Sequence, residues 1–467
     1  MSNQAIEQFR ATFWGEVVAI GDDAYESARR VHNGMIDRTP AVVVRPRGVA
    51  SVQAALAFAR EQGWNIAIRG GAHSVAGHGT CDGGMVVDLS LMRAVWVDSE
   101  ARRARVQGGA LLGDVDRETQ LHGLAVPAGQ VSTTGVAGLT LNGGMGCMQR
   151  KYGLTCDNLI AAELVTADGR IVRASEDENP ELLWALRGGG GNFGVVTSFE
   201  FALHPIGPLV YAGLVAFPLA QATEVLEFLR DYIRDAPEEL SVDAIFQHAP
   251  PLDVIPEDMR GKPMIGLFVR YIGAIEDAEP VVRPLQEFAT PIMNFVGPMP
   301  YVMVQSMIDA LNPKGWLNYW TGEYVAELGP KEIELLVEHG SNLPSHASVI
   351  QVIPFNAAVT RVAPDDTAFA HREASWLIHF LGQWSDPADT DRCRAWAKAG
   401  GTDMRALGTG DVYLNLVTDD EDVDRVTAFW DSGRLGRLAA VKAAYDPDNV
   451  FHFNHNITPA APATIES

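Results

Sequence analysis

A histidine stands at the centre of a glycine-rich loop in the first part of the chain. Residues 69–79 read Arg-Gly-Gly-Ala-His-Ser-Val-Ala-Gly-His-Gly, with His73 in the middle. Glycines let backbone N–H groups approach a bound phosphate closely, and a histidine among them can reach a bound cofactor. The alternative is a turn histidine held by hydrogen bonds, which the loop taken alone favours. No Lys-Ser/Thr pair follows, so triphosphate chemistry is not indicated.

A second glycine cluster, residues 128–146, contains six glycines and several hydroxyl side chains. Bare amides together with hydroxyls suit a pyrophosphate group. The alternative is a bulged segment without a ligand. Because glycine composition is weakly specific, this segment taken alone leaves both interpretations open.

A third glycine run contains G-x-G-x-x-G between Gly189 and Gly194. The dinucleotide-binding fingerprint of this form must follow a strand and open a helix. Here a predicted helix ending at Leu186 precedes the run, and residues 195–203 follow it as a predicted strand. We therefore reject the Rossmann interpretation.

Zinc and serine-hydrolase sites are not indicated either. His371 and His379 lie eight residues apart, and His452 and His455 three apart, without the acidic and cysteine neighbours of a zinc site. The chain also has no G-x-S-x-G nucleophile elbow. We expect no metal.

The elements that must position the first loop read strand, helix, strand. Residues 41–45 are β-branched, a helical apolar pattern runs from Ser51 to Gly63, and residues 65–69 alternate as a strand that enters the loop. Further elements are predicted up to residue 203: a strand at 84–89, hairpins at 95–97 with 104–107 and at 164–166 with 171–173, a helix at 111–122, a helix capped by Asn179 before Pro180, and a strand at 195–203.

The character of the chain changes after these elements. Glycines thin out from about residue 209 to 410, and helical patterns alternate with strand-like runs, which predicts a separate α+β domain. Its predicted helices are 223–234, 331–338 and 390–399, and its predicted strands are 264–270, 348–353 and 376–380. The predicted division is 1–206, 207–410 and a returning segment, 411–467.

Composition excludes several partners. Hydrophobic residues make up 47% of the 467 residues, enough for a large core, and the net charge of −23 disfavours nucleic acids and anionic membranes. No signal peptide and no apolar stretch of about 18 residues is visible. The four cysteines lack metal-type spacing and fit reduced structural thiols. We expect a cytoplasmic monomer or homodimer.

Four segments match the pattern of a known family. They are Arg-Gly-Gly-Ala-His-Ser (69–74), Gly-Gly-Met-Gly through Asp-Asn-Leu (143–159), Leu-Leu-Trp-Ala-Leu-Arg-Gly-Gly-Gly-Gly-Asn-Phe-Gly-Val-Val (182–196) and Tyr-Asp-Pro-Asp-Asn-Val-Phe (445–451). With them, residues 38–206 resemble the FAD-binding domain of the vanillyl-alcohol oxidase and p-cresol methylhydroxylase (PCMH) superfamily. Within it, the chain is similar to the berberine bridge enzyme-like oxidases, including bacterial 6-hydroxynicotine oxidases.

The resemblance implies a fold and a cofactor. The fold would be α+β with two domains: a split PCMH-type FAD-binding domain, and a substrate domain with an antiparallel sheet covered by helices. FAD would be joined covalently to His73. The residues implied to contact it are His73, Arg69, Gly70, Gly71, Ala72, Ser74, Gly77, His78, Gln130, Val131, Ser132, Thr134, Gly135, Gly138, Leu139, Gly143, Gly144, Gly146, Val196, Tyr413, Asn454 and Asn456.

The chain departs from the family pattern at two positions. Many relatives attach the flavin a second time through a cysteine, whose place here is taken by Val131, while Cys147 lies well past it. The resemblance therefore implies a single covalent link. The family position thought to control oxygen access falls near Thr134, which is neither the usual small aliphatic residue nor a bulky block.

The resemblance also implies an activity. A small organic substrate, an alcohol or an amine, would give a hydride to the flavin N5 while a base removes a proton, and O₂ would reoxidise the flavin to give H₂O₂. A dehydrogenase with another electron acceptor, a carbohydrate oxidase, and a flavin-bearing binding protein without turnover remain alternatives. Oxygen consumption separates the first of these from an oxidase.

Two residues are candidates for the catalytic role. Tyr413, followed by Asn415, matches the family's Tyr-x-Asn pattern, whereas a second tyrosine used as a base by some relatives corresponds to Leu416. His379 falls where some relatives place a carboxylate or a glutamine, and a histidine there could act near neutral pH. The structural alternatives are a buried, hydrogen-bonded tyrosine and a structural histidine.

Aromatic residues crowd the substrate segments, which suits a flat or apolar substrate or, more simply, an ordinary core. They are Trp316, Tyr319, Trp320, Phe355, Trp376, Phe380 and Trp384.

Overall fold

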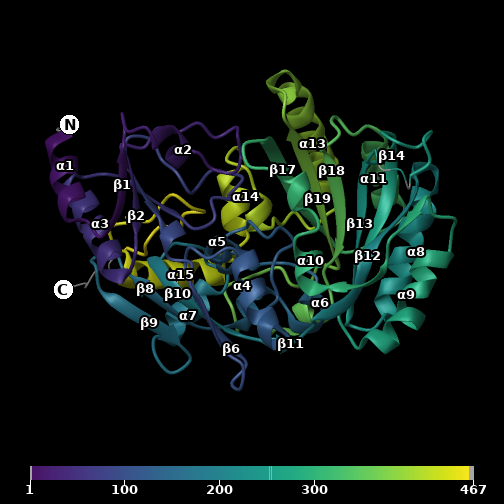
Figure 1. The fold of residues 1–467 in the computed structure, drawn as a ribbon, viewed down its shortest axis with the longest axis horizontal. Helices are drawn as coiled ribbons and strands as arrows, with labels where there is room; N and C mark the ends of the chain where they lie inside the picture. Colours follow the sequence, from purple (N-terminus) through teal and green to yellow (C-terminus); the bar gives the residue numbers. More distant parts are fainter. Residues whose placement is uncertain (1–2, 252, 254, 462–467) are drawn as a thin grey trace.

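Two smaller sheets come from the first 202 residues, and an eight-stranded sheet comes from residues 209–384. The structure is a computed structural model that describes residues 3–251, 253 and 255–461. The smaller sheets lie at one end of an elongated molecule and the large sheet at the other (Figure 1). This is the two-domain α+β arrangement that the sequence predicts, and the predicted boundary at 206/207 falls between the strands His204–Pro205 and Leu209–Pro218.

The four-stranded sheet presents the first glycine loop. Its order is β1-β2-β4-β3, with β1 antiparallel to β2 and the other pairs parallel. Because the parallel strands β2 and β3 are joined by helix α3, they form the predicted strand–helix–strand unit, and the loop starts where β3 ends. The bounds are β1 Gly15–Ala19, β2 Val42–Pro46, α3 Val49–Glu61, β3 Ile66–Arg69 and β4 Met85–Asp88.

The five-stranded sheet is antiparallel and supports the second and third glycine runs. Its order is β5-β6-β10-β8-β9, and it contains both predicted hairpins. Helix α4 precedes the second cluster, α5 lies within it, and α7 precedes the third run. The bounds are β5 Val95–Asp98, β6 Arg103–Gln107, α4 Leu112–Thr119, α5 Val136–Leu141, β8 Leu159–Val165, β9 Ile171–Ser175, α7 Pro180–Leu186 and β10 Val195–Ala202.

One detail of α7 differs from the prediction. The helix begins at Pro180 as expected, but Asn179 does not cap it. Asn179 has a positive φ of 54°, and its side-chain amide donates a 2.7 Å hydrogen bond to the Arg173 carbonyl instead. The asparagine thus closes the turn after β9, which leaves the helix N-terminus without a side-chain cap.

The eight-stranded sheet is antiparallel, and helices cover one of its faces. The strand order is β15-β12-β14-β13-β18-β19-β17, with β16 also paired to β12. The bounds are β12 Leu209–Pro218, β13 Leu240–His248, β14 Pro263–Tyr271, β15 Met293–Asn294, β16 Gly297–Pro300, β17 Leu317–Val325, β18 Val349–Pro354 and β19 Trp376–Trp384.

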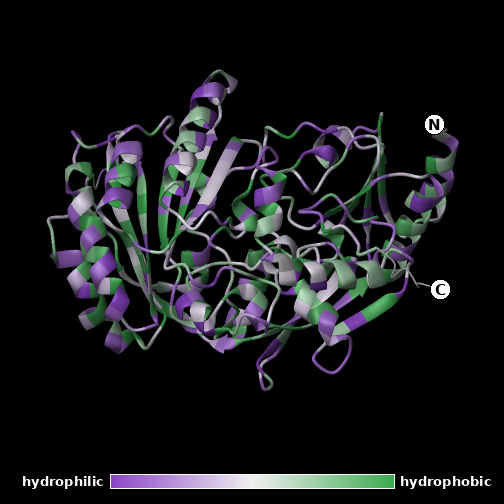
Figure 2. Cartoon of the chain, turned by 180° about the vertical axis from the view of Figure 1, so that it is seen from behind, coloured by the Kyte–Doolittle hydropathy of each residue, from purple (hydrophilic) through white to green (hydrophobic). Residues whose placement is uncertain are grey.

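The covering helices bury one apolar stripe each. They are α8 Ala222–Asp235, α9 Ala278–Glu287, α11 Pro330–Ser341 and α13 Thr390–Arg405. In α8 the buried residues Val225, Leu226, Leu229 and Ile233 recur at helical spacing. Hydrophobic and hydrophilic residues accordingly alternate along these helices (Figure 2). Their packing on one face leaves the other face of the sheet turned toward the rest of the molecule.

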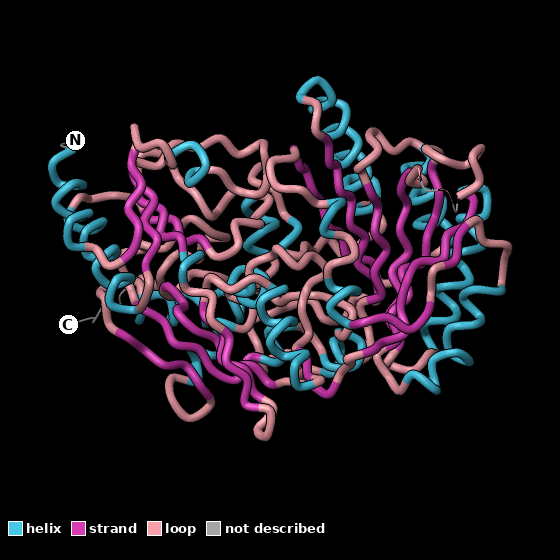
Figure 3. Tube along the Cα trace, viewed as in Figure 1, coloured by secondary structure: helices cyan, strands magenta, loops and turns pink. Residues whose placement is uncertain are grey.

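Loops fill much of the space between the large sheet and the smaller sheets (Figure 3). The C-terminal helix α15 (Ser432–Tyr445, yellow in Figure 1) returns to the first part of the chain and packs on α7. No helix within residues 3–251, 253 and 255–461 is long and apolar enough to cross a membrane.

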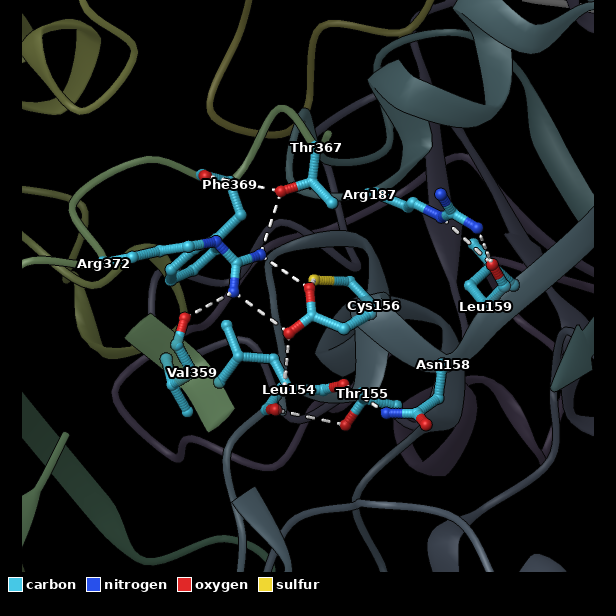
Figure 4. A network of polar contacts seen from close by, with 12 residues as sticks. Leu154, Thr155, Cys156, Asn158, Leu159, Arg187, Val359, Thr367, Phe369 and Arg372 are labelled. Carbon is cyan, nitrogen blue, oxygen red and sulfur yellow. Dashed lines mark hydrogen bonds and ion pairs between the residues drawn. The ribbon is translucent and has the colours of Figure 1, made fainter. Parts of the chain in front are cut away.

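A buried ion pair joins the segment between β18 and β19 to the loop before β8. Arg372, between β18 and β19, donates to both carboxylate oxygens of Asp157 at 3.0 and 2.6 Å, and also to the Val359 carbonyl and the Thr367 hydroxyl (Figure 4). The two charged side chains are only 6% and 8% exposed. Asp157 accepts a further bond from the Leu154 amide, so the carboxylate is well satisfied as long as the arginine is present.

We expect Arg372→Met to lower the free energy of unfolding by roughly 3–5 kcal/mol, because it leaves the Asp157 carboxylate buried without its cation. The measurement is the shift of the urea midpoint. The matched control is Arg361→Met, which breaks an exposed pair with Glu238 whose side chains are 56% and 39% exposed. That loss should stay below about 1 kcal/mol. Equal shifts for the two variants would contradict the role given to the buried pair.

Candidate active site

A cavity of about 850 Å³ lies between the glycine-rich loops and the uncovered face of the large sheet. Its walls come from residues 69–79, 129–146 and 413–417, from the last residues before 456, and from strands of the large sheet. The volume is at the upper end of the range for small-molecule sites. The cavity is therefore the candidate active site.

The two first glycine clusters meet backbone to backbone at this cavity. A Cβ added to Gly71 would lie 2.2 Å from the amide nitrogen of Gly135, and a Cβ added to Gly135 would lie 2.2 Å from that of Gly71. No side chain fits at either position without moving the main chain. Glycine at both positions is thus what lets residues 69–74 and 131–135 form one wall.

This wall exposes a row of free backbone donors. The amides of Gly71, Ala72, His73 and Ser74 make no hydrogen bond to any residue that the structure describes. Ala72 adopts a left-handed conformation with φ 62°, which turns successive N–H groups toward one side. Such a nest of amides binds anions without a charged side chain.

His73 is half-buried and held on three sides. Its Nε2 lies 3.0 Å from the Thr133 hydroxyl, and its Nδ1 lies 3.4 Å from the Thr134 hydroxyl. The ring of His32 stacks on it with centroids 3.9 Å apart. Burial, the neighbouring His32 and the Lys314 ammonium lower the pKa of His73 to about 3. The imidazole is therefore neutral at physiological pH.

Most of the residues implied to contact the cofactor line this cavity. They are Arg69, Gly70, Gly71, Ala72, His73, Ser74, His78, Gln130, Val131, Thr134, Gly135, Gly138, Leu139, Gly146, Val196, Tyr413 and Asn454. The candidate His379 lines it as well. Arg69 contributes backbone and stem only, because its guanidinium donates to the carbonyls of Ala28, Arg29 and Gly79.

Five of the implied residues, Gly77, Ser132, Gly143, Gly144 and Asn456, are not in the wall. Four of them have another structural task. Gly77 turns the loop with φ 76°, and the Ser132 amide donates to Asp309 at 2.8 Å. Gly143 gives room to two rings, because a Cβ there would meet that of Phe369 at 2.6 Å and that of Tyr413 at 3.4 Å, and a Cβ on Gly144 would meet the Thr155 Oγ1 at 2.3 Å.

Side chains alternate along the strands of the large sheet, so every second residue faces the cavity. On β19 these are His379, Leu381 and Gln383, on β18 Val349, Gln351 and Ile353, on β13 Asp243, Ile245 and Gln247, on β14 Phe268, and on β17 Trp320. His379 and Gln351 are direct cross-strand partners, and the His379 Nδ1 lies 3.2 Å from the Gln351 Oε1. Since that oxygen can only accept, Nδ1 carries the proton, and Nε2 is left as an acceptor.

The environment of His379 differs from the sequence expectation in one respect. Its Nε2 is buried and has no hydrogen-bond partner among the described residues. The Trp320 ring lies edge-on to the imidazole, with the ring centroids 5.4 Å apart. Burial lowers the pKa of His379 to about 3. A histidine that titrates near neutral pH was expected, but in this site the imidazole stays neutral and offers an unused lone pair.

The aromatic residues divide according to strand register. Trp316 and Trp320 line the cavity. Tyr319, Trp376, Phe380 and Trp384 pack under the covering helices, and Phe355 is in the core between the two domains. For these five residues the ordinary-core interpretation is the right one.

Tyr413 is buried with its hydroxyl already engaged. The hydroxyl oxygen accepts hydrogen bonds from the Gly144 amide at 2.9 Å and from the Asn415 side chain at 3.1 Å. Burial raises the pKa of Tyr413 far above its usual value. The phenol is therefore a neutral group that orients a neighbour, and it is poorly suited to take up a proton.

The C-terminal segment reaches the cavity through a buried anchor. The Lys442 ammonium donates to the Asp446 carboxylate at 2.6 Å and to the carbonyls of Asn192 and Phe451, and both charged side chains are fully buried. Asp446 also accepts from the amides of Val450 and Phe451. The motif at 445–451 and the third glycine run thus act together as a structural clasp that delivers Asn454 to the cavity wall.

Sequence reasoning missed several wall residues: His32, Asp243, Gln351, Gln383 and His455. Gln383 could have been found by counting in twos from His379 along one strand. The others depend on pairings between segments that lie far apart in the sequence. Within the described residues, no three His, Cys, Asp or Glu side chains gather as a metal site would require.

Comparison with known proteins shows which family the chain resembles. Residues 40–175 match the FAD binding domain model, and residues 412–458 match the model described as berberine and berberine like. A FAD-linked oxidoreductase of Dictyostelium discoideum is 31% identical over 98% of both chains. The (R)-6-hydroxynicotine oxidase of Paenarthrobacter nicotinovorans is 30% identical over 95% of this chain and 97% of its own.

This chain belongs to the berberine bridge enzyme-like family of FAD-linked oxidoreductases. The fold agrees. The crystal structure of 6-hydroxy-D-nicotine oxidase from Arthrobacter nicotinovorans superposes with a TM-score of 0.85 at 27% identity, covering 96% of this chain and 99% of that one. The PCMH-type two-domain fold expected from the resemblance is thereby confirmed.

The cavity fits FAD on its own chemistry. The free amides of residues 71–74 suit a pyrophosphate. The wall within the described residues has no lysine, and the Arg69 guanidinium is engaged elsewhere, so these amides are needed to bind the anion. Gly138 and Gly191 line the cavity with open space where a Cβ would stand. The buried Oδ1 atoms of Asn142 and Asn454 lack a partner among the described residues and suit the N–H groups of a heterocycle.

We expect Gly71→Ala to abolish FAD retention, because the new methyl group forces the two glycine clusters apart. The measurement is the flavin absorbance per protein after gel filtration. The matched control is Gly436→Ala in α15, an exposed helical position with nothing within 4 Å of the added Cβ. It should keep full flavin content and gain up to about 1 kcal/mol in stability. A flavin-replete Gly71→Ala protein would contradict the close-approach account.

Proposed function

We propose that this protein is an oxidase of a small, neutral alcohol or amine and that it carries FAD on His73 through a single covalent bond. The observation that carries the redox assignment is the arrangement of the cavity: a glycine wall with free amides on one side, and the unused His379 lone pair on the opposite sheet. The glycine wall suits a dinucleotide, and the His379 lone pair suits a substrate that carries an O–H or N–H group.

The state of His73 supports the covalent link. Attack on a carbon atom needs an unprotonated imidazole nitrogen, and the pKa of about 3 leaves the ring neutral. A second link has no counterpart. Val131 occupies the position where relatives carry a cysteine, and Cys147 is buried outside the cavity wall with its Sγ 3.5 Å from the Gln305 Oε1.

Side chains of the protein bind and orient the substrate, and the cofactor supplies the redox chemistry. When bound, FAD supplies the redox chemistry by accepting a hydride and passing the electrons to O₂, which becomes H₂O₂. The Nε2 of His379 accepts a hydrogen bond from the substrate O–H or N–H. Because a pKa of about 3 makes this imidazole a weak base, it takes up the proton only as loss of the hydride makes that O–H or N–H strongly acidic. Gln351 fixes the tautomer that makes this possible, and Tyr413 holds the Gly144 amide in place.

The charge balance of the cavity supports a neutral substrate. The Asp243 carboxylate lies in the wall, but Arg270 pairs with it at 2.6 Å and Gln130 donates to it at 2.8 Å. Five of the seven histidines in the wall, His32, His73, His78, His379 and His455, have pKa values lowered mainly by burial. Trp316 and Trp320 offer flat apolar surface, which suits an aromatic or otherwise planar substrate.

The test of the activity is a panel of alcohols, amines and sugars, with flavin reduction, oxygen uptake and H₂O₂ measured together. An oxidase reduces the flavin with one of them and forms H₂O₂ in equal amount to the substrate consumed. Flavin reduction with fast dye reduction but without H₂O₂ would instead establish a dehydrogenase. No flavin reduction by any compound would favour a flavin-bearing binding protein.

We expect His73→Ala to release its flavin when the protein is precipitated with acid, whereas the unchanged protein keeps the yellow colour in the pellet. The reason is that the variant lacks the nitrogen that would bond the cofactor. The control is Cys147→Ala, which should keep the flavin in the pellet. Flavin that stays with His73→Ala after precipitation would place the link on another residue.

For His379→Phe we expect a loss in kcat/KM of about 10²–10⁴-fold, the usual contribution of general acid–base catalysis. The part of the rate that depends on His379 should not change between pH 5 and 8, because a pKa of about 3 keeps the imidazole neutral across that range. The control His339→Gln removes a histidine that pairs with Asp403 outside the cavity wall and should leave the rate unchanged. A pH limb near 6.5 that disappears in His379→Phe would contradict this environment.

A further inference from the structure

His32 has no part in the proposed reaction, yet it is the residue that contacts the His73 ring face to face. The two rings stack with centroids 3.9 Å apart and planes 23° from parallel. His32 is 5% exposed and lines the same cavity. A parallel stack of two buried rings restricts the rotation of each about its Cβ–Cγ bond.

The backbone of His32 is fixed independently of His73. Its amide donates to the Ala72 carbonyl at 3.0 Å, and its carbonyl accepts from the Gly315 amide at 2.8 Å. The next residue, Asn33, donates through its side chain to the carbonyls of Val75 at 2.8 Å and Asn318 at 3.0 Å. The segment therefore bridges the first glycine loop and the start of β17, and both domains hold the His32 ring in place.

The remaining contacts of His73 act on its edge. The Thr133 and Thr134 hydroxyls approach its two nitrogens, but hydroxyls rotate and exchange donor and acceptor roles. They act within the plane of the ring and leave both of its faces uncovered. His32 covers one ring face, so it fixes that plane and shields it from water.

From these contacts we propose that His32 is the positioning residue for attachment of FAD to His73. The inference rests on the proposed covalent link and deepens it. A bond forms between a His73 nitrogen and the 8α carbon of the flavin; the imidazole N–H proton and one methyl proton leave, and the two electrons pass through the flavin to O₂, which becomes H₂O₂. A ring held in one plane reaches this carbon at the correct angle more often than a freely rotating ring.

The test measures the rate of attachment, separately from turnover. Full-length protein produced under riboflavin limitation is mixed with FAD in air, and samples are precipitated with acid at intervals. Flavin fluorescence in the pellet reports the covalent fraction, and quenching of FAD fluorescence before precipitation reports non-covalent binding. We expect His32→Ala to bind FAD to the same extent but to attach it about 10-fold or more slowly.

Two further variants separate stacking from a general structural role. His32→Phe keeps a flat ring and should attach flavin at a rate near that of the unchanged protein, whereas His32→Gln keeps polarity without a ring and should be slow. The matched control is His204→Ala, which removes a histidine stacked on Tyr152 at 3.8 Å outside the cavity wall. It should attach flavin at the unchanged rate.

Each outcome decides between the two proposals. If His32→Phe and His32→Gln attach flavin at the same rate, stacking by His32 is overturned and the His73 link stands. If the unchanged protein releases its flavin on precipitation, the His73 link itself fails, and the role of His32 fails with it. A fast His32→Phe beside a slow His32→Gln supports the inference even if His32→Ala does not fold.

Discussion

The close approach of Gly71 and Gly135 is the constraint on which the rest of the site depends. Where two backbones come within contact distance, neither residue can carry a Cβ, and the two glycine clusters become one surface. In that surface the amides of residues 71–74 have no hydrogen-bond partner among the described residues, and the Thr133 and Thr134 hydroxyls lie beside the His73 ring. An anion can then be held by neutral dipoles, and the histidine beside it need not compete with a lysine or a free arginine. The position of His73 follows from this contact, whereas its neutrality follows from burial and from the neighbouring His32 and Lys314.

The opposite wall obeys a different rule. An antiparallel sheet covered by helices on one face presents every second side chain to the other face. This alternation brings His379 and Gln351 together as cross-strand partners, and the same register sends Phe380 and Trp384 under the helices. One buried ion pair, Arg372 with Asp157, links the segment between β18 and β19 to the loops that carry the glycine clusters. The second buried pair, Lys442 with Asp446, lies at the end of α15 and fixes the C-terminal segment.

The sequence was informative where chemistry and local pattern coincide. The strand–helix–strand unit before the first loop, both hairpins and the absence of a Rossmann turn at Gly189–Gly194 could be predicted, because each depends on neighbours in the chain. Strands β12, β13 and β17 were missed. In β12 both faces are largely buried, so its apolar run lacks a clear period of two. The resemblance implies that Gly143 and Gly144 contact the cofactor, but a sequence does not show that they also make room for Phe369 and Thr155. His32 and Gln351 act only through partners far away in the sequence, which no local pattern reports.

The site also shows how a strongly acidic protein can hold a neutral reaction chamber. The net charge is −23, yet Asp243 in the wall is compensated by Arg270, and burial lowers the pKa values of His73 and His379 to about 3. Desolvation acts on each imidazole in the same direction, because the charged form loses more hydration than the neutral form.

A neutral imidazole has one donor and one acceptor, so its function is set by which nitrogen is already occupied. Gln351 occupies the Nδ1 of His379 and leaves its acceptor to the cavity. At His73 both nitrogens face hydroxyls that can turn away, which is what a nitrogen that must form a bond requires. The same residue type thus serves two purposes through its hydrogen-bond partners alone.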